Sequence, residues 1–316
     1  MDGTSSDLAI DVRGLTKTFG KLTVVNKVDI QMPRGQVWGF LGPNGSGKTT
    51  TIRMLCGLLK PDAGEGTCLG YDILKDSREI KNQVGYMTQK FSYWEDLSIR
   101  ENLEFVANLY ELKDKKKVVD QTLATLGLTS RQRQLAGTLS GGWKQRLALA
   151  ACTLHNPKML MLDEPTAGVD PQARRDFWDQ IHRLSAQGLT VLVSTHYMDE
   201  AERCDQIVYI AYGNLMAQGR VQDIIDQSGL YTFIAEGPGV RELMERMRGK
   251  DGAEQVAYFG NALHVSGSDL DKLKKLIDND GDKTGVTWRQ ERPNLEDVFI
   301  HLMDTSVDNS VQQAGA

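Results

Sequence analysis

The residues best suited to chemistry form one glycine-rich run, Gly42-Pro43-Asn44-Gly45-Ser46-Gly47-Lys48-Thr49, which is followed by Thr50. Its spacing is G-x-x-x-x-G-K-[S/T], and it stands between the strand-like stretch VWGFL and the helix-forming stretch TTIRML. Backbone N–H groups of such a loop surround phosphate oxygens, the lysine ammonium reaches the β and γ phosphates, and the threonine hydroxyl binds Mg²⁺. The run therefore predicts a nucleotide phosphate site, and the alternative is a glycine-rich turn that binds nothing.

An acidic pair, Asp163-Glu164, ends the apolar stretch Met159–Leu162. Ligands of α/β proteins bind at the carboxyl ends of strands, so both carboxylates are placed to meet the nucleotide. We expect Asp163 to hold Mg²⁺ and Glu164 to polarise a water for in-line attack on the γ-phosphate. The alternative is a helix N-cap pair ahead of Pro165.

Strand-like and helix-like segments alternate around these residues, which is typical of a parallel α/β sheet. The strand patterns cover Leu8–Val12, Val24–Ile30, Gln36–Leu41, Lys158–Leu162, Thr190–Ser194 and Ile207–Ala211. Helical spacing covers Ile99 to about Leu126 and Ala173–Leu184. The lysines at 115–117 are interpreted as a solvated helix face, with a binding patch as the alternative.

The stretch Leu139-Ser140-Gly141-Gly142-Trp143-Lys144-Gln145-Arg146, followed by LMLDEPTAGVD, resembles the signature region of the ATP-binding cassette (ABC) ATPases. We expect Ser140 to cap a helix whose first N–H groups, at Gly141 and Gly142, meet a phosphate. In this family that helix start faces the ATP held by a partner subunit, so two chains enclose two nucleotides. Trp143 replaces the family's usual glutamine, which exchanges a polar contact near the nucleotide for packing and puts the hydrolysis rate in doubt.

Four further positions match the family pattern. Gln89 resembles the glutamine that senses Mg²⁺ and the attacking water, and His196 resembles the histidine that contacts the γ-phosphate. Asp170 matches the loop that crosses the dimer interface and is also expected to cap a helix ahead of Pro171. Phe19 falls where the family stacks an aromatic ring on adenine. A polar loop residue and a structural histidine are the respective alternatives for the first two.

Three aromatic residues, Phe91, Tyr93 and Trp94, come directly after Gln89, whose loop touches the membrane subunit in this family. Exposed aromatic side chains suit a protein interface, so one interpretation is a surface that receives a permease helix. The other is packing in the core.

The resemblance implies an α/β P-loop ABC ATPase fold over residues 8–228, with a RecA-like parallel sheet, an antiparallel β subdomain and an inserted helical subdomain at about 95–155. Residues 229–304 show the order β-α-β-β-α-β, which predicts a small α+β domain of ferredoxin-like type. Its expected elements are Tyr231–Ala235, Val240–Met247, Glu254–Phe259, Ala262–Ser266, Leu270–Ile277 and Val286–Gln290. We expect residues 305–316 to form a flexible tail.

Composition excludes several function classes. The 37 Lys and Arg residues against 42 Asp and Glu residues give a net charge of −5, which argues against nucleic acid as a partner. The four cysteines form no C-x-x-C pair, so zinc is not expected. No leader pattern is recognised at the start, and no apolar run approaches the roughly 18 residues of a spanning helix. We therefore expect a peripheral protein at the cytoplasmic face of the inner membrane.

The resemblance implies an ATPase that uses ATP and Mg²⁺, dimerises with a second ABC subunit, and drives an export complex through integral-membrane permease subunits. The stretch Arg292–Phe299 resembles the ends of ATPases from drug-, antibiotic- and polysaccharide-export systems. One alternative is a soluble ABC ATPase that acts on a macromolecular assembly such as the ribosome or DNA. Another is a slow or silent regulatory cassette, supported by Trp143 alone. A P-loop kinase does not account for the signature motif.

Overall fold

The computed structural model describes residues 7–280 and 285–304, so the predicted tail at 305–316 lies outside the described residues. Contacts divide the chain into two compact units between Gln218 and Gly219, and each unit is described by itself. Within the two described ranges, no helix is both long enough and apolar enough to cross a membrane.

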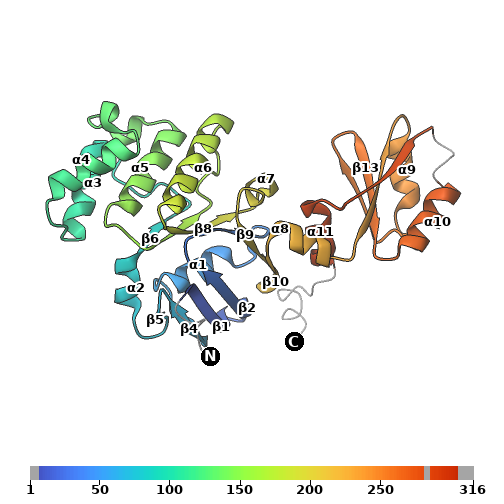
Figure 1. Cartoon of the computed structure of the whole chain (residues 1–316), viewed down its shortest axis with the longest axis horizontal. Coiled ribbons are helices and arrows are strands. Elements are labelled where there is room, and N and C mark those ends of the chain that lie inside the picture. Colours follow the sequence, from blue (N-terminus) through green and yellow to red (C-terminus); the bar gives the residue numbers. More distant parts are fainter. Residues whose placement is uncertain (1–6, 281–284, 305–316) are drawn as a thin grey trace. The chain divides into compact units, whose positions relative to one another are not determined.

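The first unit is built on a six-stranded sheet with the order β10-β9-β3-β8-β7-β6 (Figure 1). Its strands are β3 (Val37–Leu41), β6 (Val84–Met87), β7 (Met159–Asp163), β8 (Thr190–Thr195), β9 (Gln206–Ala211) and β10 (Asn214–Gly219). The pairs β6–β7, β7–β8, β8–β3 and β3–β9 are parallel. Every residue of β3, β7 and β8 is buried, as expected for parallel strands with both faces covered.

A four-stranded sheet with the order β2-β1-β4-β5 adjoins this core, and the pairs β1–β2, β1–β4 and β4–β5 are antiparallel. Its strands are β1 (Leu8–Phe19), β2 (Leu22–Pro33), β4 (Ala63–Cys68) and β5 (Tyr71–Asp72). The first two strands are longer than the apolar patterns predicted. Their pairing contains register shifts or bulges, where the regular alternation of apolar and polar residues is interrupted. The apolar side chains of this sheet and of helices α1 (Lys48–Leu55) and α2 (Ser77–Gln83) form one core cluster.

The predicted helical subdomain comprises α3 (Ile99–Leu109), α4 (Lys115–Thr125), two short 3₁₀ turns and α5 (Gly141–Thr153). A capping box between Ser98 and Glu101 starts α3. Helices α6 (Pro171–Ala186) and α7 (Met198–Ala201) follow β7 and β8. The lysines at 115–117 are exposed, in agreement with a solvated face.

The second unit contains a four-stranded antiparallel sheet with the order β12-β13-β11-β14. Its elements are α8 (Val221–Gln227), β11 (Tyr231–Glu236), α9 (Val240–Met247), β12 (Gln255–Phe259), β13 (Ala262–Gly267), α10 (Leu270–Asp280), β14 (Thr287–Glu291) and α11 (Leu295–Asp304). The sequence predicts a domain boundary near Ser228. In the structure the boundary lies between Gln218 and Gly219, so α8 belongs to the second unit.

Candidate nucleotide site

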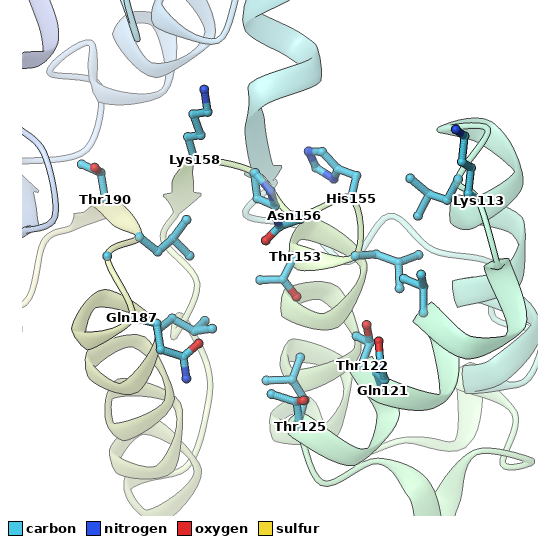
Figure 2. Close-up of a pocket in the computed structure, with 18 of the residues that line it drawn as sticks. Lys113, Gln121, Thr122, Thr125, Thr153, His155, Asn156, Lys158, Gln187 and Thr190 are labelled. Carbon is cyan, nitrogen blue, oxygen red and sulfur yellow. The ribbon is translucent and has the colours of Figure 1, made fainter. Parts of the chain in front are cut away.

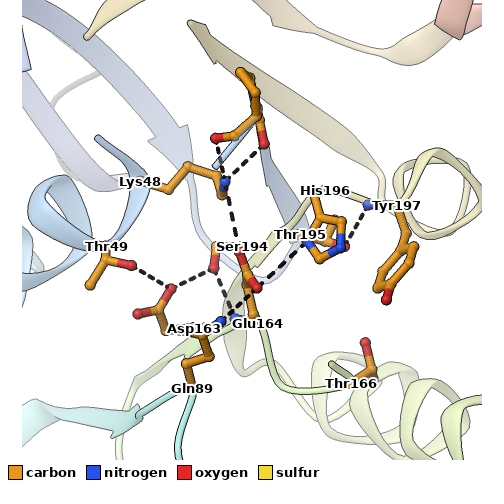
Figure 3. Close-up of polar contacts among 12 residues, drawn as sticks. Lys48, Thr49, Gln89, Asp163, Glu164, Thr166, Ser194, Thr195, His196 and Tyr197 are labelled. Carbon is orange, nitrogen blue, oxygen red and sulfur yellow. Dashed lines mark hydrogen bonds and ion pairs between the residues drawn. The ribbon is translucent and has the colours of Figure 1, made fainter. Parts of the chain in front are cut away.

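The predicted site residues follow the carboxyl ends of four neighbouring strands. The phosphate loop follows β3, Gln89 follows β6, Asp163 ends β7 and His196 follows β8. Since these strands are parallel, their carboxyl ends meet at one edge of the sheet (Figure 3). The side chains are thus brought together from positions far apart in the sequence.

The phosphate loop leads directly into α1. Gly47 is the N-cap residue with φ of +101°, and an added Cβ would lie 2.6 Å from the Val24 carbonyl oxygen, so only glycine fits without strain. No side chain caps α1 and its first turn holds no acidic residue, which leaves its N–H groups for an anion. The Ser46 hydroxyl is buried without a hydrogen-bond partner among the described residues. Both features fit a phosphate group.

Lys48 is buried at the centre of the site, and its ammonium donates hydrogen bonds to the carbonyls of Gly42 at 2.8 Å and Pro43 at 3.0 Å. Burial lowers the pKa of Lys48 below its ordinary value, although the charges of Glu164 and Asp163 act in the opposite direction. The Lys48 Nζ lies 3.8 Å from Glu164 Oε1. The ammonium is therefore poorly hydrated and close to the acidic pair.

Asp163 is buried and its Oδ1 accepts hydrogen bonds from Thr49 Oγ1 at 3.1 Å and from Ser194 Oγ at 2.8 Å. These contacts join the carboxylate to the start of α1 and to β8, so it does not act as a helix cap. A carboxylate and a hydroxyl oxygen at this distance form the oxygen-rich pair that Mg²⁺ prefers.

The Glu164 carboxylate lies close to the side chains of Gln89, His196 and Lys48. Gln89 Nε2 donates to Glu164 Oε2 at 2.9 Å, and His196 Nδ1 lies 3.5 Å from the same oxygen. The backbone φ of Glu164 is +46°, a left-handed conformation that is unusual for a residue with a side chain. Its N–H donates to Ser194 Oγ at 2.9 Å, which holds the turn in place.

A second layer of polar residues was not recognised from the sequence. Ser194 accepts from the Glu164 backbone and donates to Asp163, so it links the two acidic residues. Glu200 is fully buried and accepts hydrogen bonds from Thr166 at 2.5 Å and Thr195 at 2.6 Å. The only available signal was the pair Ser194-Thr195 at the end of an otherwise apolar strand.

Ser140 occupies the N-cap position of α5, with Gly141 and Gly142 in the first turn. Ser140 is therefore the N-cap residue as expected, although its side chain makes no cap hydrogen bond. Extended φ and ψ angles at Ser140 start the helix without that bond, which leaves the hydroxyl available to another group. An added Cβ at Gly142 would lie 2.6 Å from the Cβ of Ala173 in α6, so glycine permits the close approach of the two helices.

Asp170 caps α6 as predicted, because its Oδ1 accepts hydrogen bonds from the backbone N–H groups of Gln172 at 3.1 Å and Ala173 at 2.9 Å. Phe19, at the end of β1, is 50% exposed, so one half of its surface is free to meet a base.

The aromatic residues after Gln89 divide between the two interpretations. Phe91 and Tyr93 pack against the core cluster of the helical subdomain. Trp94 is 45% exposed and lies against Phe105 with ring centroids 4.2 Å apart. Only Trp94 of the three therefore offers a large surface to solvent.

A pocket of about 750 Å³ lies at the opposite, amino edge of the central sheet (Figure 2). Its lining includes Arg34, Lys158 and Thr190, which precede or begin β3, β7 and β8. None of the predicted site residues lines it, so this pocket is separate from the nucleotide site.

Comparison with known proteins agrees with this geometry. The family model described as "ABC transporter" matches residues 25–167. The Nod factor export ATP-binding protein I of Rhizobium sp. (strain N33) is 34% identical over 301 residues, which are 94% of this chain and 97% of that protein. The probable multidrug ABC transporter ATP-binding protein YbhF of Escherichia coli (strain K12) is 41% identical over 230 residues, 72% of this chain. The match spans only 40% of the length of YbhF.

Solved structures share the fold over most of this chain. The ADP conformation of MJ1267, an ATP-binding cassette of an ABC transporter, is 26% identical with a TM-score of 0.62, covering 68% of this chain and 92% of that chain. A structure of an ATP-binding subunit of an ABC transporter is 28% identical with a TM-score of 0.63, covering 70% of this chain and 93% of that chain. The predicted P-loop ABC fold class is confirmed, and the chain belongs to the ATP-binding proteins of the ABC transporter family.

Proposed function

We propose that this protein binds ATP with Mg²⁺, hydrolyses it, and energises an export complex as a dimer on integral-membrane permease subunits. The observation that carries the proposal is the convergence of Lys48, Asp163, Glu164, Gln89 and His196 at one sheet edge. The relatives named for multidrug transport and Nod factor export support transport over the alternative of a soluble ABC ATPase.

Nucleotide binding would use the loop and the start of α1. Residues Gly42 to Thr50 would surround the phosphates through their backbone N–H groups, with Lys48 as the cation and Phe19 against the base. Mg²⁺ would be held by Thr49 and Asp163 with help from Gln89, and when bound it would neutralise charge that develops on the phosphates. No group of three or more His, Cys, Asp and Glu side chains that could hold a metal occurs among the described residues. Magnesium at phosphate sites commonly needs only one or two protein ligands.

Hydrolysis would depend on Glu164. Its carboxylate would orient a water molecule for in-line attack and accept a proton, while Gln89 would fix the carboxylate and His196 would contact the γ-phosphate. Glu164 is already hydrogen-bonded to Gln89 and close to His196, so these three groups need little rearrangement to act together.

The dimer would complete each site. Ser140, Gly141 and Gly142 of one chain would meet the nucleotide bound by the other, because α5 presents an uncapped helix start. Asp170 would lie at the same interface. The exposed Trp94, close in sequence to Gln89, supports a permease contact beside the site. A position at the cytoplasmic face of the inner membrane follows from this partnership.

The test is the Glu164→Gln variant compared with the parent in an ATPase assay and in equilibrium binding of ATP. We expect binding to stay within about threefold and turnover to fall by about 10²-fold or more, since a general base contributes this much. The variant should also accumulate as an ATP-bound dimer. Wild-type turnover in Glu164→Gln would refute the assigned role of Glu164.

Transport itself is tested by copurification of the tagged chain from gently solubilised membranes, with mass spectrometry of the proteins that accompany it. Recovery with multi-span permease subunits that stimulate hydrolysis is the expected result. Recovery with ribosomes or DNA instead would contradict the proposal.

A further inference from the structure

The indole ring of Trp143, which replaces the usual glutamine after the two signature glycines, contacts two guanidinium groups. The Arg131 Cζ is 4.7 Å from the ring centroid and the Arg146 Cζ is 5.1 Å from it. Both distances are within the range of a cation–π contact. These three residues are called the Arg–Trp–Arg stack. Trp143 is also partly buried against the core of the helical subdomain.

The stack continues into the next helix. Arg146 Nη2 lies 2.8 Å from Asp176 Oδ2 in α6, and Gln172 Nε2 donates to Asp176 Oδ1 at 2.8 Å. Gln172 and Asp176 lie in the first two turns of α6, whose cap is Asp170. A continuous series of contacts therefore joins the start of α5 to the start of α6.

Close backbone packing makes this connection stiff. The first turns of α5 and α6 meet at Gly142 and Ala173, where no space remains for an added Cβ. Arg131 belongs to the 3₁₀ turn η1 (Thr129–Arg131), so the stack also fastens α5 to the segment that precedes it. The first turns of α5 are thus in contact with α6 on one side and with η1 on another.

We propose that Trp143 is a positioning residue, which through the Arg–Trp–Arg stack keeps the starts of α5 and α6 in the orientation that receives the nucleotide of the partner subunit. The inference rests on the proposed dimer function. A glutamine at this position would act by its own polar contacts, whereas the indole acts through its neighbours. Pre-ordering of the two helix starts lowers the cost of closing the dimer, and this raises dimer affinity without a new contact to ATP.

The experiment measures the dimer dissociation constant in ATP and Mg²⁺ by analytical ultracentrifugation, far below the unfolding temperature. Every variant is made in the Glu164→Gln background so that ATP is not consumed. Trp143→Leu keeps apolar packing and removes the π face, while Trp143→Phe keeps a π face. Arg131→Gln removes one cation of the stack. Arg133→Gln is the matched control, because Arg133 is exposed and its side chain makes no hydrogen bond, ion pair or ring contact within residues 7–280 and 285–304.

We expect Trp143→Leu to raise the dimer dissociation constant about tenfold and Arg131→Gln to raise it about threefold. Trp143→Phe should keep most of the dimer affinity that Trp143→Leu loses. ATP affinity of the monomer should be unchanged for all of them, and Arg133→Gln should match the parent. A purely structural role of Trp143 would lower the melting temperature but leave the dimer constant of the folded variants unaltered.

Failure of the proposed function and failure of the positioning role of Trp143 would give different results. If Glu164→Gln alone forms no ATP-dependent dimer, the proposed function is wrong. If it dimerises but Trp143→Leu and Arg131→Gln dimerise equally well, only the positioning role is overturned. If Arg131→Gln and Arg133→Gln raised the dimer dissociation constant equally, the positioning role would also be overturned, because the effect would then come from surface charge. If Trp143→Leu does not fold, the dimer dissociation constant of Arg131→Gln tests the positioning role by itself.

Discussion

Asn102 in α3 is fully buried, and its side chain forms hydrogen bonds with the segment that leads from Gln89 to this helix. Its Oδ1 accepts from the Trp94 backbone N–H at 3.0 Å, and its Nδ2 lies within hydrogen-bond distance of the carbonyls of Trp94 at 3.0 Å, Leu97 at 3.3 Å and Ser98 at 3.0 Å. Because the amide nitrogen carries two hydrogens, the side chain makes about three hydrogen bonds, one through Oδ1 and two through Nδ2. At about 1 kcal/mol net for each, Asn102→Ala should cost about 3 kcal/mol of unfolding free energy.

The first assays are urea unfolding and a thermal melt, followed by hydrogen exchange of the Trp94 amide. A loss of about 3 kcal/mol should lower the melting temperature by about 6–12 °C for a unit of this size. The Trp94 amide should exchange about 100-fold faster, because the same free energy opens its hydrogen bond. Asn108→Ala is the control on the same helix, since Asn108 is exposed and its side chain accepts a hydrogen bond from Lys115 at 2.7 Å.

A cost below about 0.5 kcal/mol for Asn102→Ala, equal to that of Asn108→Ala, would contradict the reasoning from buried hydrogen bonds. A large loss of stability with unchanged exchange at Trp94 would show that Asn102 supports the core and not this segment.

Two further substitutions probe the phosphate loop. Gly47→Ala should lower stability by more than about 2 kcal/mol and abolish binding of a fluorescent ATP analogue, because φ is +101° and the added Cβ meets the Val24 carbonyl; a thermal melt and a titration check both effects, and normal binding would contradict the expectation. The lowered pKa of Lys48 means that the unfolded chain holds more protons between the folded pKa and the ordinary 10.5, so stability should rise with pH in that window. Urea unfolding of the parent and Lys48→Met across this window should show that rise in the parent alone.

The sequence predicted the parts of the molecule that depend on local pattern. The phosphate loop, the acidic pair after an apolar strand and the order of strands and helices follow from glycine spacing and apolar periodicity, and the signature motif identified the family. The strand order also explains why Gln89, Asp163 and His196 meet, since parallel strands bring their carboxyl ends to one edge.

Features that depend on a distant partner were not predicted. Asn102 lies in an ordinary helical pattern, and its burial depends on carbonyl groups of the preceding loop. The partners of Trp143 come from a 3₁₀ turn and from its own helix, so the residue alone indicated only a departure from the family. Helix α11 was missed because its start is marked by reciprocal bonds between Asn294 and Asp297, a less common form of capping box.

The left-handed backbone of Glu164 has a genetic consequence. A residue with a side chain in this conformation costs about 1–2 kcal/mol, and glycine adopts it without that cost. Glu164→Gly would lose the contacts to Gln89 and Lys48 but recover this strain, so the fold should persist without the carboxylate. If the proposed function holds, such a protein would still accumulate, bind ATP and pair with normal subunits. Loss of this one side chain should therefore be dominant over the wild-type copy, whereas mutations that unfold the chain should be recessive.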